Sequence, residues 1–235
     1  MRAKRNIGSS AGLWAVVGAG ALFGLAACGS SGSSSNGESA KSPTQILSDA
    51  QAATAGVSSV HITGQSTSSG KQVTLDVVDG QGKGGGTIGI SGANLHLVLA
   101  QPNVYIKADE ASWQKLTQNG AAAGILANKW LQTTTADSNY ADLGNFLDIS
   151  KVPGQFSPKG TVSKGSSTTF NGKSAIPLID SGGDGTLYVA STGTPYILGV
   201  KGGTDSPGTV TFSQYNTATI PTAPSGAVSL SQLEG

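Results

Sequence analysis

The sequence contains one cysteine, Cys28, and only two arginines, both of which lie within its first five residues. A single cysteine cannot form an internal disulfide, so we expect neither a disulfide framework nor a cysteine-based zinc site. Histidine occurs twice, and charged residues make up only 11% of the chain. These shortages exclude thiol-rich and charge-dense classes of protein and indicate a fold that depends on apolar packing.

Basic residues are too few for a nucleic-acid partner. Beyond residue 27 the chain has 11 lysines and no arginine against 13 carboxylates, a net charge of −2. Proteins that bind nucleic acids use dense basic surfaces and favour the forked guanidinium group of arginine. We therefore expect no nucleic-acid partner.

The N-terminus has the pattern of a secretory signal. Basic residues in Met1–Arg5 precede a glycine-containing apolar run over 11–25, which is short for a membrane span and is followed by Ser and Gly. The run ends in Leu25-Ala26-Ala27-Cys28, which resembles a lipobox. The resemblance implies cleavage between Ala27 and Cys28 and a diacylglyceryl group on the Cys28 thiol. The alternatives are an ordinary signal peptide followed by a free cysteine, and an uncleaved anchor.

This signal divides the chain into three parts. We assign residues 1–27 to a lipoprotein signal peptide, 28–42 to the lipidated cysteine and a flexible Gly/Ser tether, and 43–235 to one folded domain. As a coil the tether reaches roughly 20 Å. Two acyl chains hold a protein firmly, so we expect a lipid-anchored protein on the outer face of the cytoplasmic membrane, in the cell envelope.

The folded domain is predicted to begin with a helix. Ser42, Pro43 and Gln45 have the pattern of a capping box with proline at the first helical position. Apolar residues then recur at helical spacing as far as Gly56, where the helix can end.

From Ser58 onward the apolar residues alternate, which is the period of β-strands. Glycine- and proline-containing turns separate the strands, and Asn171-Gly172 predicts a type I′ hairpin. Residues 112–126 and 140–147 are predicted as short helices around a strand at 130–133. About a dozen strands without a regular βαβ alternation predict a mainly β (α+β) fold.

No motif predicts catalysis, so we expect a protein that is not an enzyme, with no catalytic residue and no cofactor. Gly80, Gly82 and Gly85 fit the pattern G-x-G-x-x-G. A strand follows them where a phosphate site needs a helix, so we interpret them as a flexible hairpin tip.

The remaining polar candidates have simpler structural explanations. His61 and His96 lie opposite the aliphatic faces of their strands, and we expect hydrogen-bonded or solvated side chains rather than a shared metal site. Asp109 and Glu110 are either an acid/base pair or, as we favour, the cap of a helix. The larger aromatics are either a sugar-stacking platform or, as we favour, a cover for the sheet and helices. They are Trp113, Trp130, Tyr188 and Tyr196.

Several short segments along the chain resemble one known family. They are the lipobox at Cys28, Val57–His61, Val104–Lys107 with Trp113, Tyr140–Leu143, Val152-Pro153, Asn171–Lys173, Leu187–Val189, Pro195–Leu198 and Val210–Phe212. In this arrangement the sequence resembles the actinobacterial lipoproteins of the LppX/LprG type, which have a LolA-like fold. The resemblance implies a single, strongly curved antiparallel sheet, a half-barrel, with two or three helices on its concave side.

Members of that family hold the acyl chains of lipids or glycolipids between sheet and helices and carry them in the cell envelope. The resemblance therefore implies a monomeric lipid-binding or lipid-transport lipoprotein, with its cavity lined by the alternating aliphatic residues. These candidates are Val60, Ile62, Val73, Leu75, Val77, Leu95, Leu97, Leu99, Val104 and Ile106. The alternative is a non-catalytic structural or protein-interaction module with a fully packed core. The small residues of Gly120–Gly124 fit both, because they either leave a cavity open or let a helix pack closely.

Overall fold

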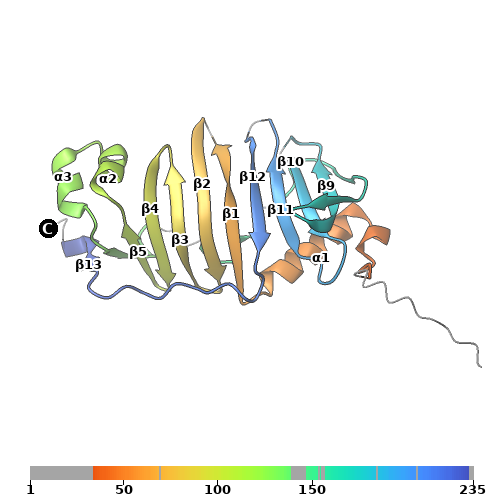
Figure 1. Cartoon of the computed structure of the whole chain (residues 1–235), viewed down its shortest axis with the longest axis horizontal. Coiled ribbons are helices and arrows are strands. Elements are labelled where there is room, and N and C mark those ends of the chain that lie inside the picture. Colours follow the sequence, from red (N-terminus) through yellow and green to blue (C-terminus); the bar gives the residue numbers. More distant parts are fainter. Residues whose placement is uncertain are drawn as a thin grey trace, which may run out of the picture. The chain divides into compact units, whose positions relative to one another are not determined.

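The computed structural model describes residues 34–68, 70–138, 147–152, 154, 157–183, 185–204 and 206–232. Over these residues the main feature is one 13-stranded sheet, in the order β13-β6-β5-β4-β3-β2-β1-β12-β11-β10-β9-β7, with β8 paired to β9 (Figure 1). The strands are β1 (Ser59–Ser68), β2 (Lys71–Gly80), β3 (Lys83–Ile90), β4 (Ala93–Ala100), β5 (Asn103–Lys107), β6 (Leu131–Thr134), β7 (Val162–Lys164), β8 (Thr168–Phe170), β9 (Lys173–Asp180), β10 (Gly185–Ala190), β11 (Ile197–Gly202), β12 (Gly208–Ser213) and β13 (Val228–Ser229).

The described strands pair antiparallel, apart from β13, which runs parallel to β6. The sheet curves without closing into a barrel, and three α-helices accompany it. The predicted fold class, a mainly β protein built on one curved antiparallel sheet, is therefore confirmed.

Helix α1 (Pro43–Ala55) begins and ends where the sequence predicts. The Gln45 backbone N–H donates to Ser42 Oγ over 3.3 Å, and the Ser42 backbone N–H donates to Gln45 Oε1 over 3.2 Å. Both halves of the capping box are thus formed, and Gly56 is the C-cap. Ile46, Leu47 and Ala50 are buried against the sheet, where α1 contacts β7, β10 and β11.

Helices α2 (Glu110–Thr117) and α3 (Gly120–Leu126) lie at the other end of the sheet, next to β4 and β5 (Figure 1). Asp109 caps α2, since its Oδ1 accepts a 2.7 Å bond from the Ser112 backbone N–H. Ala123 is completely buried in α3, which packs against α2. Within Gly120–Gly124, Ala123 is thus the residue that packs closely, whereas Gly120, Ala121 and Gly124 are exposed. Two short 3₁₀-helices complete the described elements, Glu38–Ala40 and Leu230–Gln232.

Strand register places the predicted aliphatic residues on one face of the sheet. One row of directly opposed residues crosses six strands: Ile62, Val77, Gly86, Leu97, Ile106 and Leu131. This face, which we call the core face, also carries the buried side of α1, since both belong to one hydrophobic cluster. The alternation predicted from the sequence is therefore confirmed. In each of these strands the predicted aliphatic side chains lie on the same face of the sheet.

A non-helical segment covers part of the core face. Residues 147–152 cross near the β2–β3 turn, where the Ile149 backbone N–H donates to the Gly80 carbonyl over 3.2 Å. Leu147 and Ile149 are completely buried, and Val152 is nearly so. The helix predicted at 140–147 lies outside the described residues, apart from Leu147.

The glycines of the β2–β3 hairpin correct one sequence interpretation. The turn holds Gln81 and Gly82, whereas Gly84, Gly85 and Gly86 lie inside β3. A Cβ on Gly84 would stand 2.6 Å from the Leu147 carbonyl oxygen. The predicted flexible tip is thus limited to the turn itself, and Gly84 allows the crossing segment to approach the backbone of β3.

The N-terminal approach to α1 is also different from the prediction. Asn36 Nδ2 donates to the carbonyl oxygens of Ala190 (2.9 Å) and Gly193 (3.1 Å), and Ser35 forms a β-bridge with Thr192. Glu38 is only 3% exposed and pairs with Lys41 over 2.8 Å. The flexible tether predicted over residues 28–42 is wrong for this part, and the fold begins before residue 43. Polar side chains, rather than apolar ones, attach the segment to the sheet.

The C-terminal segment crosses the opposite face, which we call the outer face. It leaves β12 and passes in front of β1–β5 to reach β13 (Figure 1). Pro221 packs over Gly85, where an added Cβ would be 3.3 Å from Pro221 Cγ, and the Val228 backbone N–H donates to the Trp130 carbonyl. None of the helices in the described ranges is long and apolar enough to cross a membrane.

Candidate ligand-binding site

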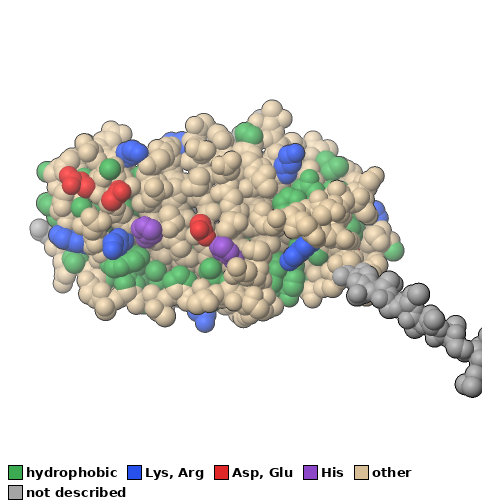
Figure 2. Space-filling view, in the orientation of Figure 1, with side chains coloured by type: hydrophobic (Ala, Val, Ile, Leu, Met, Phe, Trp, Pro, Cys, Tyr) green, Lys and Arg blue, Asp and Glu red, His purple; other side chains and the backbone are tan. Residues whose placement is uncertain are grey.

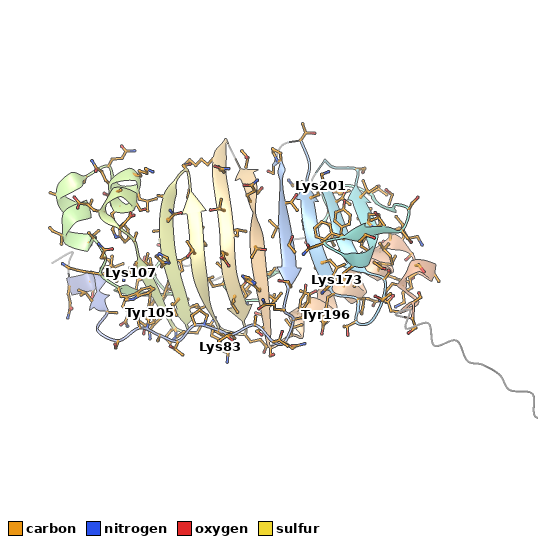
Figure 3. The ribbon with its side chains drawn as sticks, in the orientation of Figure 1. Lys83, Tyr105, Lys107, Lys173, Tyr196 and Lys201 are labelled. Atoms are coloured by element: carbon orange, nitrogen blue, oxygen red, sulfur yellow. The ribbon has the colours of Figure 1, made fainter. Side chains whose placement is uncertain are left out.

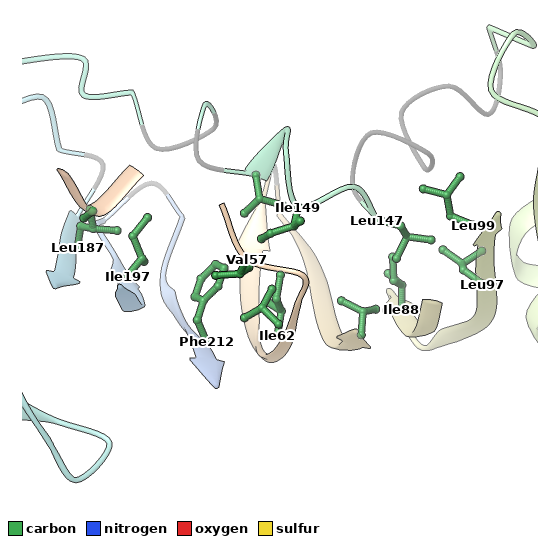
Figure 4. Packing of buried hydrophobic residues seen from close by; sticks show 14 of the residues in the cluster. Val57, Ile62, Ile88, Leu97, Leu99, Leu147, Ile149, Leu187, Ile197 and Phe212 are labelled. Atoms are coloured by element: carbon green, nitrogen blue, oxygen red, sulfur yellow. The ribbon is translucent and has the colours of Figure 1, made fainter. Parts of the chain in front are cut away.

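The ten predicted cavity residues lie together on the core face, on β1, β2, β4 and β5. Eight of them are buried, while Val73 and Leu75 are partly buried. Figure 4 shows part of this cluster, with Leu97 and Leu99 near Leu147 of the crossing segment, and Ile62 near Val57 and Phe212. Their role as the lining of a lipid cavity stays a prediction.

A cleft of about 310 Å³ lies further along the core face, between α1 and the strands β7, β9, β10 and β11. Its apolar wall consists of aliphatic side chains from all five elements: Leu47, Val162, Leu178, Leu187 and Val200. The sequence predicts β9, β10 and β11 but not β7, and it assigns none of their residues to a site. The signals available were the continuous apolar runs Ala175–Ile179 and Leu187–Val189, which indicate buried strands but do not show which residues face the cleft.

Strand register brings the aliphatic wall of this cleft together. Val200, Leu187 and Leu178 form one row across β11, β10 and β9, directly below α1. In the next row toward the strand ends, Gly202 and Gly185 stand opposite each other. An added Cβ on Gly202 would be 1.9 Å from the Ser206 carbonyl oxygen, so glycine here lets the backbone at Ser206 pass close to β11.

The rim of this cleft is polar. Asp180 accepts hydrogen bonds from the backbone N–H groups of Gly182 (3.0 Å), Lys159 (2.9 Å) and Gly160 (2.9 Å). These bonds hold the pKa of Asp180 below its usual value, so the carboxylate is charged at neutral pH. An apolar interior below a charged rim suits an amphiphilic ligand, with its apolar part inside and its polar part in water.

Asp79 is a buried acid on the core face. Its side chain is 0% exposed, and within the described structure neither carboxyl oxygen has a hydrogen-bond partner. Burial raises the pKa of Asp79 to about 8, and the nearby Asp148 adds to the shift. Asp79 is therefore mostly protonated at pH 7. The sequence contained a signal for this burial, because Asp79 lies two positions after Val77 and so falls on the same face of the strand. Asp79-Gly80, however, also has the composition of a turn.

Asp148 belongs to the crossing segment and has its own partners. Its Oδ1 accepts from Ser150 Oγ over 2.8 Å, and its Oδ2 accepts from Gln101 Nε2 over 3.2 Å. The crossing segment thus brings a hydrogen-bonded carboxylate, that of Asp148, close to Asp79. Asp79 itself has no hydrogen-bond partner among the described residues.

The two histidines lie on the outer face, as the alternation predicts (Figure 2). His61 Nε2 is 2.7 Å from Asp76 Oδ1, and His96 Nδ1 is 3.1 Å from Thr87 Oγ1. Two strands separate His61 from His96, which is about 14 Å at the usual strand spacing. Among the described residues there is no group of three or more metal-ligating side chains.

The four candidate aromatics do not form one platform. Trp113 packs against the core cluster, and its Nε1 is buried without a hydrogen-bond partner in the described structure. Tyr188 stacks on Phe170 with ring centroids 4.4 Å apart. Tyr196 stacks on Tyr215 at 4.1 Å, and Trp130 lies before β6 at the other end of the sheet.

Known structures share this arrangement of strands and helices. The crystal structure of LprF from Mycobacterium bovis superposes with a TM-score of 0.53 at 16% identity, covering 77% of this chain and 96% of LprF. The chain has the fold of LprF. The resemblance to LppX/LprG-type lipoproteins that the sequence indicated is thus confirmed at the level of the fold.

Two further solved structures are similar at lower scores. The lipoprotein LppX from Mycobacterium tuberculosis has a TM-score of 0.46 at 12% identity, covering 75% of this chain and 97% of its own. An uncharacterized conserved protein from Thermus thermophilus has a TM-score of 0.41 at 10% identity, covering 80% of this chain and 97% of its own. No family model matches the sequence, and no curated protein matches it.

Proposed function

We propose that this protein is a membrane-anchored, extracytoplasmic lipoprotein that binds a lipid or glycolipid as a monomer, with an acyl chain in the cleft beside α1. The observation that carries the proposal is the cleft of about 310 Å³ on the core face, with its aliphatic wall and charged rim. The fold shared with LprF and the resemblance of the sequence to LppX/LprG-type lipoproteins support the same function.

The chemistry of the cleft suits an acyl chain. Each methylene group that leaves water contributes about 0.8 kcal/mol, so about six methylenes against Leu47, Leu178 and Leu187 contribute roughly 5 kcal/mol. The cleft volume is near the lower limit for small-molecule sites, which suits part of one chain. Such binding needs packing and a polar rim rather than a nucleophile or a base, and we propose that the protein is not an enzyme.

The N-terminal segment supports the placement of this cleft near a membrane. Asn36 is bonded to the loop after β10, and Lys164 Nζ donates to the Ser39 carbonyl over 2.6 Å. The chain therefore enters the fold beside the strands that form the cleft. Cys28 lies outside the described residues, but the stretch from Cys28 to Ser35 spans at most about 25 Å. A diacylglyceryl group on Cys28 would keep this end of the sheet close to the bilayer, where a lipid ligand is available.

A competing function is supported by the dense packing of the β1–β5 part of the core face. Val60, Leu99 and Val104 are completely buried there. A protein whose core face is fully packed would act as a structural or protein-interaction module of the cell envelope.

Lipid binding separates the two functions. Native mass spectrometry of the detergent-purified lipoprotein should detect a bound lipid, and a fluorescent palmitoyl phospholipid should bind with saturation. Val162→Trp places a large side chain in the cleft from a partly buried position and should abolish uptake while the protein stays folded. Ile179→Trp on β9 is the matched control, because Ile179 is 42% exposed and does not line the cleft. No bound lipid in either assay, or equal uptake by Val162→Trp, would favour the packed module.

A further inference from the structure

The outer face carries a second and larger cleft, of about 600 Å³. It lies over β3, β4 and β5, between Trp130 and Pro221. This cleft is on the side of the sheet opposite the proposed lipid site and shares no lining residue with it, so a ligand here does not depend on lipid binding.

Polar side chains reach this cleft from rigid elements. Thr87, His96 and Lys107 are directly opposed on β3, β4 and β5. The pairing of Ile106 with Leu131 places Trp130 beside Lys107, whose Nζ lies 5.8 Å from the centre of the indole ring. Figure 3 shows Lys107 at the end of β5, close to the two helices. Strand register, rather than a loop, therefore sets the spacing of these groups.

Hydrogen bonds also fix two of the polar groups. His96 Nδ1 is engaged by Thr87 Oγ1 at 3.1 Å, and Nε2 has no partner among the described residues. Asp109 Oδ1 accepts from the Ser112 N–H at 2.7 Å as the cap of α2, and the Ser112 hydroxyl also bonds to this carboxylate. Hydrogen bonding to Ser112, together with the charges of Lys115 and His96, lowers the pKa of Asp109, so a carboxylate faces the cleft at neutral pH.

The cleft thus combines an aromatic face, two cationic or donating groups, one carboxylate and the amide of Asn128. A sugar ring has an apolar face of C–H groups and a rim of hydroxyls that both donate and accept hydrogen bonds, and it matches this set. Asp109 repels a simple anion, and the polar lining disfavours an acyl chain. Pro221 supplies an apolar wall away from Trp130.

We propose that the outer-face cleft is a saccharide-binding site in which a neutral sugar ring stacks on Trp130 and hydrogen-bonds to Asp109 and His96. In a protein of the cell envelope, such a site would hold it against a glycan or recognise the sugar of a soluble ligand.

The test is saturation-transfer difference NMR on the intact lipoprotein in a detergent without sugar. The probes are methyl α-glucoside, methyl α-mannoside, methyl β-galactoside, N-acetylglucosamine, arabinose and trehalose. At least one probe should bind with saturation, and Trp130→Ala should weaken its binding by about tenfold or more. Asp109→Asn keeps the helix cap, because asparagine also caps, and should weaken binding without unfolding the protein.

Matched controls keep the result specific. Tyr188→Ala removes an aromatic ring from β10, far from the cleft, and should leave saccharide affinity unchanged. Val162→Trp should also leave it unchanged, so a failure of lipid binding is distinguishable from a failure of this site. If no probe binds, or if Trp130→Ala and Asp109→Asn both bind as the wild type does, the proposal is overturned.

Discussion

Val60 and Asp79 are directly opposed on β1 and β2, so the core face sets a carboxyl group against a fully buried aliphatic side chain. The rest of that row consists of Gly84, Leu99, Val104 and Thr133. A charged carboxylate in this row would have no partner. Because burial raises the pKa of Asp79 to about 8, its carboxyl group is protonated and neutral below that pH.

This burial predicts how stability changes with pH. The folded protein keeps a proton on Asp79 up to about pH 8, whereas the unfolded chain releases it near the ordinary pKa of 3.8. The unfolded state therefore binds fewer protons between these values, and the free energy of unfolding should fall by about 1.4 kcal/mol per pH unit there. Above pH 8 the contribution of Asp79 should stay constant.

The variant Asp79→Asn should flatten this dependence, because its amide does not titrate. Urea unfolding at pH 5, 7 and 9 would measure the slopes. Asp76→Asn is the control, since Asp76 lies on the same strand but on the outer face, where its Oδ1 contacts His61. If Asp79→Asn keeps the wild-type slope, Asp79 is not the titrating group.

A second prediction concerns the close approach of Leu147 to Gly84. Gly84→Ala brings a methyl group to within 2.6 Å of the Leu147 carbonyl oxygen, so the crossing segment has to move. We expect a loss of roughly 2–3 kcal/mol in the free energy of unfolding, measured by denaturant titration. Gly120→Ala is the matched control: nothing lies within 4 Å of its added Cβ, and alanine favours helix α3. Equal stability of the two variants would show that the segment does not press on β3.

A third prediction tests the ordered N-terminal segment. Asn36→Ala removes two hydrogen bonds to the backbone of residues 190 and 193, and should cost about 1–2 kcal/mol locally. Hydrogen exchange should then show faster exchange of the Asn36 and Lys41 amides, while the amides of β1 keep their protection. Ser34→Ala is a suitable control, since Ser34 is exposed. Unchanged exchange at both amides would mean that Asn36 does not attach the segment.

The last prediction concerns the anchor. Cys28→Ala should release the protein from membranes or leave an uncleaved precursor, because the thiol is the only acceptor for the diacylglyceryl group. Metabolic labelling with an alkyne fatty acid should mark the wild type alone. Labelling of Cys28→Ala at the wild-type level would contradict lipidation at this residue.

Local signals in the sequence predicted local structure well. Ser42 and Gln45 determine the start of α1 because both partners of the capping box lie within four residues. Asn171 and Gly172 both have positive φ angles, 47° and 75°, as a type I′ turn requires. Strand alternation likewise gave the correct face, since the period of two is a property of each strand by itself.

Features that depend on distant parts of the chain were missed. The tether prediction used composition alone. Asn36 is held in place by hydrogen bonds to carbonyl groups more than 150 residues later in the chain, which composition does not reveal. The buried state of Asp79 depends on the crossing segment, whose position has no local signal. The α1 cleft was also missed, because its wall joins Leu47 to residues of strands that begin more than 100 positions later.

The pairing of β1 with β12 has a consequence for the order in which the protein forms. His61 is paired with Ser213, 152 positions later, and this ladder joins a run of neighbouring hairpins, β1–β5, to the strands of the C-terminal half. Each half contains contacts between near neighbours, which form quickly, whereas the joint between them has to wait for a long loop to close. During synthesis from the N-terminus, β1 therefore emerges with an open edge that stays unpaired until almost the whole chain has followed.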